Sequence, residues 1–188
     1  MRLVFLDFDG ALNSLRYIYS HERPLPNQLD PYRVRLVDAL CRETGAAVVV
    51  ASRAWRINYQ DRWHELLAVL RAKGLTAPVV GHTITCAHHR GPEIASWIAL
   101  ASLDTGIPVE DFRPVILDDD RDMEAMSPRM VGTRCRVGLQ PRHVHKVARV
   151  MLRPLERSCC EFIQAREPAG WHCLAAHTSI EGESVCHR

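Results

Sequence analysis

The sequence has little excess charge of either sign and no long hydrophobic run, and both shortages exclude broad classes of protein. Its 188 residues include 24 Lys and Arg against 22 Asp and Glu, so 24 − 22 leaves a formal charge of +2. That near balance argues against a strongly basic nucleic-acid coat and against an acidic disordered tail. The longest uncharged, mostly apolar stretch, Ile94 to Leu103, is only about half as long as a membrane-spanning helix. We therefore expect no membrane span.

An uninterrupted apolar run is also lacking at the N-terminus, because Asp7 and Asp9 fall inside the first apolar segment. A secretory signal peptide needs such a run. With 47% hydrophobic and 24% charged residues, the composition is ordinary for a globule with a real core, and the length suits one domain with a short appendage. A cytoplasmic protein is the resulting expectation.

The cysteines lack the regular spacing of a disulfide framework, and their number, seven, is odd. Four of them crowd the C-terminal region with three histidines: Cys159, Cys160, Cys173, Cys186, His172, His177 and His187. Because the C-x2-C and H-x3-H spacings of structural zinc sites are missing, two interpretations stay open, a metal site and an irregular extension. Pro154 and the polar sequence after it indicate the end of the folded body. We therefore predict a domain at 1–152 and a Cys- and His-containing extension at 153–188.

Within residues 1–152, short apolar runs alternate with segments of helical periodicity. Strands are expected at 3–6, 46–51, 78–80, 114–117 and 130–133, and helices at 32–44, around 63–70, at 92–103 and at 143–152. Gly45 stands where the first helix would end, and Pro92 suits the first turn of the third. Such alternation predicts the α/β class, with βαβ units and a mostly parallel sheet.

Polar side chains follow three of the expected strands at the point where each strand ends. Asp7 and Asp9 follow the first, Ser52 follows the second, and the run from Asp118 to Asp120 follows the fourth. In parallel sheets the ligand lies beyond the carboxyl ends of the strands, so we expect these groups to converge on one crevice. Neighbouring carboxylates repel one another, and a hard divalent cation such as Mg2+ removes that cost.

Such a cluster suits phosphoryl transfer. A bound Mg2+ would neutralise phosphate oxygens, and an Asp carboxylate can then attack phosphorus to form an aspartyl-phosphate. A second Asp two residues later can protonate the leaving oxygen and afterwards activate water. The hydroxyl of Ser52 can donate a hydrogen bond to the phosphoryl group, or it can simply cap the helix that follows.

The segment Val4 to Leu12, VFLDFDGAL, resembles the first motif, hhhhDxDGxh, of haloacid dehalogenase (HAD) superfamily phosphatases. The resemblance continues, in the superfamily's order, through VVASRAWR (Val49 to Arg56), RGPEI (Arg90 to Ile94) and VILDDD (Val115 to Asp120). It covers about residues 1–152. The S-x-x-W-R and R-G-x-E-I elements are most similar to the HAD domains called Swiss Army Knife RNA repair-like.

The resemblance implies a Rossmann-like fold and a role for each matched residue. Asp7 would be the nucleophile and Asp9 the general acid and base, while Asp7, Asp118, Asp119 and the Asp9 backbone carbonyl would hold Mg2+. Ser52 would bind the phosphate, with Arg53 and Arg56 adding positive charge nearby. The chain departs from the superfamily where a Lys is usual: Arg90 is the best candidate there and Lys73 a weaker one.

Several roles stay open from the sequence alone. Arg56 either contacts substrate or pairs with a local carboxylate such as Asp61. Glu93 either positions Arg90 or supports the start of a helix. Asp120 and Asp122 either support the metal from outside its ligand shell or cap a helix.

About forty residues separate Asp9 from Ser52, and about as many separate Ser52 from Arg90. Each gap is taken up by a helix with its connections, so we expect no substantial cap domain and an open site. The leading hypothesis is a Mg2+-dependent phosphohydrolase acting on a phosphomonoester, with a nucleic-acid end or a nucleotide as the preferred substrate class. The alternative is a non-enzymatic, regulatory module on the same fold that binds phosphate or RNA ends. The sequence names no protein partner.

Overall fold

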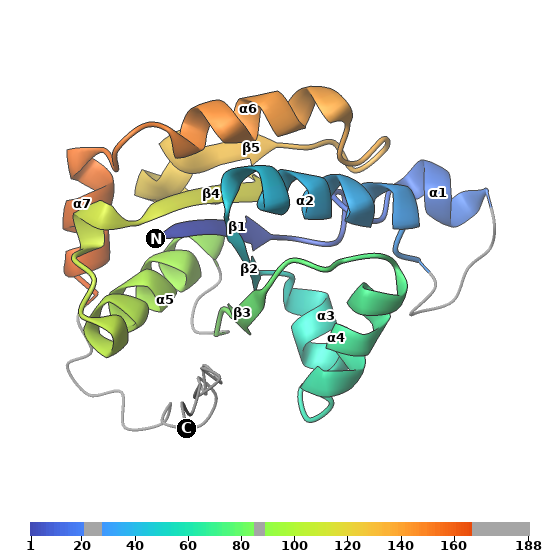
Figure 1. Ribbon diagram of the computed structural model, residues 1–188, viewed down its shortest axis with the longest axis horizontal. Coiled ribbons are helices and arrows are strands. Elements are labelled where there is room, and N and C mark those ends of the chain that lie inside the picture. Colours follow the sequence, from blue (N-terminus) through green and yellow to red (C-terminus); the bar gives the residue numbers. More distant parts are fainter. Residues whose placement is uncertain (21–27, 85–88, 167–188) are drawn as a thin grey trace, which may run out of the picture.

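The computed structural model of the chain describes residues 1–20, 28–84 and 89–166 (Figure 1). Its centre is a five-stranded parallel sheet in the order β3-β2-β1-β4-β5. The strands are β1 (Arg2–Leu6), β2 (Ala47–Val50), β3 (Val79–His82), β4 (Arg113–Asp118) and β5 (Met130–Gly132). This architecture confirms the predicted α/β class and the parallel, Rossmann-like sheet. From β1 the chain adds β2 and β3 on one side of the sheet and then β4 and β5 on the other side. In such sheets a ligand is expected beyond the carboxyl ends of the strands where the direction changes, which here are β1 and β4.

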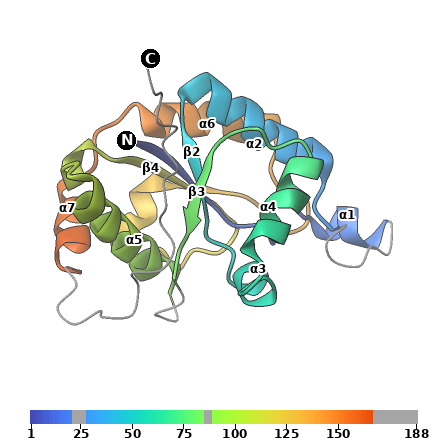
Figure 2. The ribbon, with the colours of Figure 1, turned by 60° about the horizontal axis from the view of Figure 1, so that its bottom comes forward.

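Helices cover both faces of the sheet (Figures 1 and 2). They are α1 (Leu15–Tyr19), α2 (Pro31–Thr44), α3 (Arg53–Asn58), α4 (Trp63–Ala72), α5 (Arg90–Thr105), α6 (Pro141–Met151) and α7 (Arg157–Gln164), with 3-10 turns at Val109–Asp111 and Glu124–Arg129. One core lies between the sheet and the face that α2, α4 and α6 cover, and a second lies under α5 and α7. Alternate residues of β1 enter the two cores: Val4 and Leu6 the first, Leu3 and Phe5 the second.

Local sequence explains where α2 begins and ends. The Asp30 side chain accepts a hydrogen bond from the Tyr32 N–H, and Pro31 takes the first helical position, where a missing N–H costs nothing. Gly45 ends the helix with φ of 67°, a left-handed conformation that glycine adopts without strain. The predicted C-terminal glycine of this helix is thus confirmed.

Three features differ from the expected elements. Helix α1 has no buried side chain and α3 spans only six residues, so neither carries enough apolar periodicity to be read from sequence. Helix α7 lies beyond Pro154, where we expected the folded body to end. Its Cys159 and Ile163 are buried with Leu155 in the second core, so the packed structure continues past the proline.

The division into 1–152 and 153–188 stays a prediction, because residues 167–188, with Cys173, Cys186 and three histidines, lie outside the described residues. Of the described part of the extension, the Cys159 thiol donates to the Ala125 carbonyl at 3.1 Å and serves packing. No described helix is long and apolar enough to cross a membrane.

Asp38 on α2 ties that helix to the turn before β3. Its Oδ1 accepts hydrogen bonds from the Thr76 N–H (2.5 Å), the Thr76 hydroxyl (2.8 Å) and the Ala77 N–H (2.8 Å), and Arg42 pairs with its Oδ2 at 3.1 Å. Burial by itself raises the pKa of Asp38, but these donors and Arg42 outweigh it, so the net pKa is lowered.

We predict that Asp38→Asn lowers the free energy of unfolding by about 1–3 kcal/mol at pH 7, because an amide cannot accept three donors as a carboxylate does. A folded-state pKa below the ordinary value of about 3.9 stabilises the protein above that pH, and the contribution is lost as pH falls through the folded pKa. The difference from wild type should therefore shrink below about pH 4. Urea unfolding at pH 7 and pH 3 measures it. Asp104→Asn, at an exposed carboxylate, is the control, and a pH-independent difference would contradict the assignment.

Candidate active site

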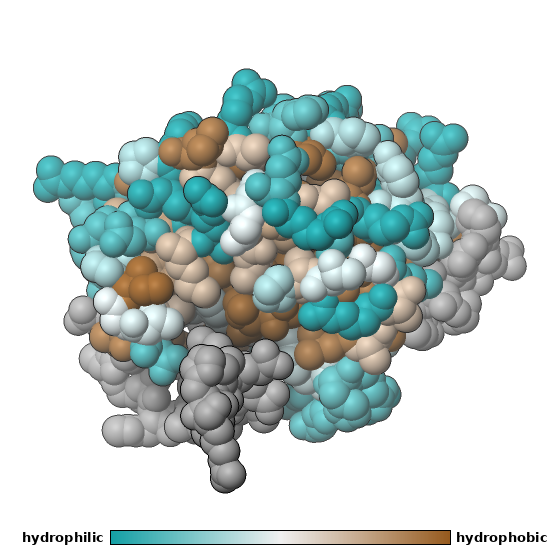
Figure 3. Space-filling view, viewed as in Figure 1, coloured by the Kyte–Doolittle hydropathy of each residue, from teal (hydrophilic) through white to brown (hydrophobic). Residues whose placement is uncertain are grey.

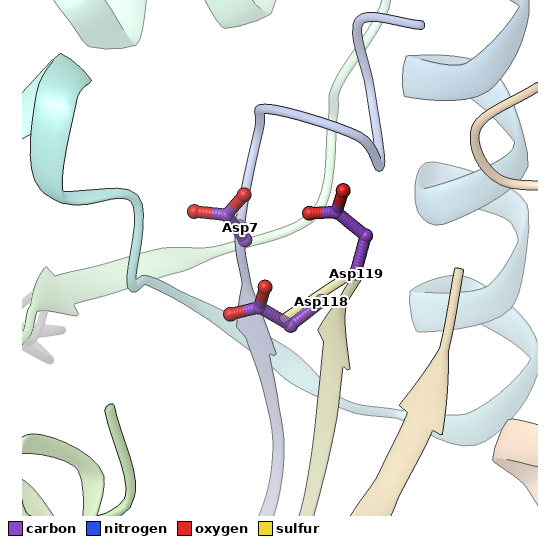
Figure 4. A group of neighbouring side chains, drawn as sticks. All are labelled: Asp7, Asp118 and Asp119. Carbon is purple, nitrogen blue, oxygen red and sulfur yellow. The ribbon is translucent and has the colours of Figure 1, made fainter. Parts of the chain in front are cut away.

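Three aspartates meet at the carboxyl ends of β1 and β4 (Figure 4). Asp7 follows β1, Asp118 is the last residue of β4, and Asp119 comes next in the chain. A carboxylate oxygen from each lies within 4.8 Å of the other two. The Asp7 N–H donates to the Leu117 carbonyl at 2.9 Å, which continues the strand pairing past β1 and fixes the Asp7 backbone beside Asp118.

Burial makes this cluster electrostatically costly. Asp7 is only 3% exposed and Asp118 only 1%. Burial, followed by the charge of Asp118, raises the pKa of Asp7 well above its ordinary value, although Arg90 opposes the shift. Burial likewise raises the pKa of Asp118 to about 6, against the opposing charge of Arg90, and it raises the pKa of Asp119. The three carboxylates therefore require positive charge to stay ionised together near neutral pH.

Arg90, the first residue of α5, supplies part of that charge. Its Nη2 lies 3.2 Å from Asp7 Oδ1 and its Nε lies 3.1 Å from Asp118 Oδ2, while its Nη1 donates to the Ala51 carbonyl. One guanidinium thus links β1, β2 and β4 at their carboxyl ends. Lys73, the weaker candidate for this role, ends α4 and makes no described contact with the cluster.

Two contacts from the loop after β4 hold Arg90 in place. The Arg90 N–H donates to Asp122 Oδ2 at 2.9 Å, and the Gly91 N–H donates to the Asp122 carbonyl at 3.2 Å. Gly91 is required here, because a Cβ on it would lie 2.2 Å from the Met123 carbonyl oxygen. Of the two roles left open for Asp122, the structure shows the capping one, at the start of α5.

The loop after Asp7 turns back on itself and holds Asp9. The Asn13 side-chain amide donates to Asp9 Oδ1 at 2.7 Å, and Asn13 Oδ1 accepts from the Gly10 N–H at 3.1 Å. Asp9 is exposed, so its carboxylate faces solvent beside the buried cluster. Sequence reasoning missed Asn13; its only signal is an Asn four residues after Asp9 in a loop, where such side chains often bond to nearby backbone.

Two buried hydroxyls, those of Ser52 and Thr83, come just after β2 and β3. The Ser52 hydroxyl faces Asp7 and lowers the pKa of that carboxyl, against the larger effect of burial, whereas Thr83 Oγ1 meets no donor or acceptor among the described residues. Ser52 is the N-cap residue of α3, yet its side chain caps no N–H of that helix. A buried hydroxyl that faces Asp7 from the end of β2 is placed to donate to a ligand atom held at Asp7.

Arg56 lies behind the site rather than on its surface. The Arg56 side chain is buried and pairs with Glu93 at 2.7 Å, not with Asp61. Its guanidinium also donates to the carbonyls of Ser52 (3.2 Å), Ala51 (3.4 Å) and Thr83. Glu93 therefore pairs with Arg56, and the pair joins α3, α5 and the ends of β2 and β3. Arg53, by contrast, is exposed at the start of α3.

A pocket of about 300 Å³ lies beyond Arg56, between α3, α4 and the end of β3. Its lining is mainly aromatic and polar: Arg56, Ile57, Tyr59, Gln60, Trp63, His82, Thr83 and Ile84. The Trp63 and His82 rings lie 4.8 Å apart between centroids. Since Ser52 is the N-cap residue of α3 and Tyr59 its C-cap residue, the length of this short helix separates the pocket from Ser52.

The donor set fits a hard divalent cation. All candidate ligands are carboxylate oxygens, which Mg2+ prefers, and an oxygen from each of the three lies within 4.8 Å of the other two. Arg90 alone faces Asp7 and Asp118, so at least one of the three negative charges is left without a cationic partner in the described cluster. Asp7, Asp118 and Asp119 are the residues that would hold the ion.

Comparison with known proteins gives one family. The family model described as "HAD domain in Swiss Army Knife RNA repair proteins" matches residues 3–144. The match begins at the second residue of β1, includes the other four strands and every aspartate of the cluster, and ends inside α6. Neither the curated proteins nor the solved structures include a significant match to the chain.

Gly10 lets the two acidic loops approach each other, and this generates a prediction. It has φ of +73°, and a Cβ on it would lie 2.2 Å from Asp119 Cγ. We expect Gly10→Ala to lose stability and to displace Asp119, so that Mg2+ raises its melting temperature less than it raises that of wild type.

Gly106→Ala is the matched control, since Gly106 has φ of +69° but a Cβ there meets no atom within 4 Å. This control should show only the cost of the left-handed backbone, about 1–2 kcal/mol, and should keep the full Mg2+ shift. Thermal unfolding with and without Mg2+ measures both quantities. Equal Mg2+ shifts in the two variants would contradict the role given to Gly10.

Proposed function

Because the chain belongs to the family of HAD domains in Swiss Army Knife RNA repair proteins, we propose that it is a Mg2+-dependent phosphohydrolase that acts through an aspartyl-phosphate. The observation that carries the proposal is the buried cluster of Asp7, Asp118 and Asp119 around Arg90. A module that only binds phosphate has no use for clustered carboxylates, which repel the ligand. A phosphatase needs them, one as the nucleophile and the others as metal ligands.

In the first step, an Asp7 carboxylate oxygen attacks phosphorus while the bond from phosphorus to the leaving oxygen breaks. Asp9 donates a proton to that oxygen, and the alcohol leaves. In the second step, water attacks the phosphorus of the aspartyl-phosphate and Asp9 takes its proton. The bond between phosphorus and Asp7 then breaks, which regenerates the carboxylate and releases inorganic phosphate. Bound Mg2+ would supply Lewis-acid neutralisation of the phosphoryl oxygens.

The surrounding residues have separate tasks in this mechanism. Arg90 holds Asp7 beside Asp118 and contributes positive charge toward the transferred group. The Ser52 hydroxyl, buried and facing Asp7, would donate to a phosphoryl oxygen. Arg53 is exposed at the start of α3 and is available to substrate, whereas Arg56 supports the site through Glu93 and the carbonyls that it bonds.

A phosphomonoester on a nucleotide or a nucleic-acid end is the proposed substrate class. The family description refers to RNA repair proteins. The pocket beside Tyr59 and Trp63 supports the same class, since aromatic rings stack on nucleobases, and Gln60 offers a donor and an acceptor to a base edge. The described chain between Asp9 and Ser52 forms α1, α2 and β2 and no separate cap domain, which suits access by a polymer end. A cytoplasmic location stays a prediction.

We predict that Asp7→Asn abolishes release of phosphate while the protein stays folded. The measurement is phosphate release from p-nitrophenyl phosphate and from a 3′-phosphorylated oligonucleotide, with Mg2+ or with EDTA. Asp9→Asn should impair turnover most for the oligonucleotide, whose alcohol leaves less readily than p-nitrophenolate does. Asp104→Asn, at an exposed carboxylate near the end of α5, is the control. Mg2+-dependent release that persists in Asp7→Asn would contradict the nucleophile assignment.

The bridging geometry of Arg90 gives a second prediction. Arg90→Lys keeps the charge but cannot reach Asp7, Asp118 and the Ala51 carbonyl together, because an ammonium group lacks the guanidinium's fork. We expect kcat/KM to fall moderately in Arg90→Lys and by about 10²–10³-fold in Arg90→Gln. For both substrates, kcat/KM should be highest for wild type, lower for Arg90→Lys and lowest for Arg90→Gln. Full activity of Arg90→Gln would show that the charge is not needed.

A further inference from the structure

One part of the sequence has no acidic residue at all, although the whole chain is nearly neutral. Between Glu124 and Glu156, residues 125–155 contain no Asp or Glu but include seven basic residues: Arg129, Arg134, Arg136, Arg142, Lys146, Arg149 and Arg153. Only Arg129 of these is buried; it bonds to the carbonyls of Pro114, Arg153 and Pro154. The other six are exposed.

Helix α6 arranges three of these charges in a row. Arg142, Lys146 and Arg149 are spaced by four and three residues, which places them on one helical face over about 10 Å. None of the three forms a hydrogen bond or ion pair with any part of the chain that the structure describes. In Figure 3, hydrophilic residues line the upper edge of the molecule, where Figure 1 shows α6. We call Arg142, Lys146 and Arg149 the α6 basic row.

A groove runs beside this row, against the edge strand β5. A pocket of about 390 Å³ there is lined by Met130, Val131 and Gly132 of β5 and by Lys146, Arg149 and Val150 of α6, with Arg153 at its end. Its floor is therefore apolar and its rim is cationic. Cationic grooves with apolar floors suit single-stranded nucleic acid, whose backbone is anionic and whose unpaired bases need apolar cover.

The row begins at the same edge of the sheet as the carboxylate cluster. The loop before α6 carries Arg134 and Arg136, and its backbone bonds to the loop that follows Asp7. Cys135 O accepts from the Leu15 N–H at 2.9 Å, and the Leu139 N–H donates to Ala11 O at 2.9 Å. Thr133, just before it, donates its hydroxyl to Gly10 O at 2.8 Å. Exposed cations thus run from the site's own loops along α6.

We propose that the α6 basic row and its groove bind the sugar–phosphate backbone of a single-stranded nucleic acid whose phosphorylated end enters the carboxylate cluster. The inference rests on the proposed function, because that function places the phosphorylated end of the nucleic acid at the carboxylate cluster. It identifies the substrate as a polynucleotide rather than a free nucleotide. Backbone contacts by unpaired Arg and Lys side chains supply affinity without sequence preference.

An anionic membrane is the main competing partner for a basic helix, and the packing of α6 disfavours it. An interfacial helix inserts its apolar face into lipid. Val147 and Met151 of α6 are instead buried in the first core, and Val144 and Val150 pack against that core. The described α6 therefore presents charge outward and no continuous apolar face.

The test compares the full-length wild type with the triple variant R142Q/K146Q/R149Q. Fluorescence anisotropy follows binding of a labelled single-stranded RNA with a 3′-phosphate over a range of salt concentrations. Each phosphate contact to a single strand contributes about −0.7 to the slope of log K against log[salt]. Loss of three contacts should therefore make that slope less negative by about 2, and it should weaken binding at least about tenfold at low salt. Hydrolysis of p-nitrophenyl phosphate should be unchanged, because that substrate does not reach α6.

The control variant R2Q/K73Q/R157Q removes the same charge, from +2 to −1, at positions outside the row, on β1, after α4 and on α7. It should bind RNA nearly as wild type does. Equal RNA binding by both variants would overturn the proposal, as would wild-type binding to phosphatidylserine vesicles without binding to RNA. Because anisotropy needs no turnover, the binding result decides this inference even if the protein hydrolyses neither phosphate substrate.

Discussion

The structure depends on a concentration of negative charge that the fold itself creates. A parallel sheet whose order reverses at β1 brings Asp7 and Asp118 to the same edge, and the strand pairing leaves their carboxylates within reach of Asp119. Burial removes the water that would otherwise screen them, which is why the pKa values of all three are raised. Two neighbouring residues, Arg90 and Gly10, make this arrangement of carboxylates possible. Arg90 enters between two of the carboxylates, and Gly10 is small enough for Asp119 to lie against its backbone.

A second ion pair, Arg56 with Glu93, supports the segment after β2 to which Arg90 bonds. Arg90 bonds to the Ala51 carbonyl, and Arg56 bonds to the same carbonyl from behind. Arg56 is in turn paired with Glu93, one turn further along α5 than Arg90. The buried Arg56–Glu93 pair thus sets the start of α5 against the end of β2. A buried ion pair of this kind adds little net stability, but removal of one partner leaves an uncompensated buried charge. The role of this pair is therefore to fix the position of α5 relative to α3.

The sequence predicts the sheet and the aspartates well because both depend on local patterns. Apolar runs mark the strands, and Asp7 and Asp118 stand where those runs stop. Residues that act through distant partners could not be predicted in this way. The nearest acid to Arg56 in sequence is Asp61, yet its partner is Glu93, 37 positions away, because the fold brings the first turn of α5 within hydrogen-bond reach of Arg56 on α3. Asn13 and Thr83 carry no periodic signal. Helix α7 was missed because it follows Pro154 in a polar segment and has only two buried side chains, Cys159 and Ile163, which are too few to give a helical apolar pattern.

Net charge is a poor guide to charge distribution, and this chain shows why. A formal charge of +2 excludes a protein that is basic throughout, but it is equally consistent with an acidic cluster and a basic row on one molecule. The two need each other in a phosphatase that acts on polymers. In the proposed mechanism, the carboxylates would repel every phosphate that approaches them, and one metal ion with Arg90 would offset this only for the phosphate that reacts. The remaining phosphates of a polynucleotide need cations elsewhere, far enough from the carboxylates to stay unpaired. Helix α6 meets that requirement, because its own apolar side is taken up by the core and its outer side carries only basic and neutral residues.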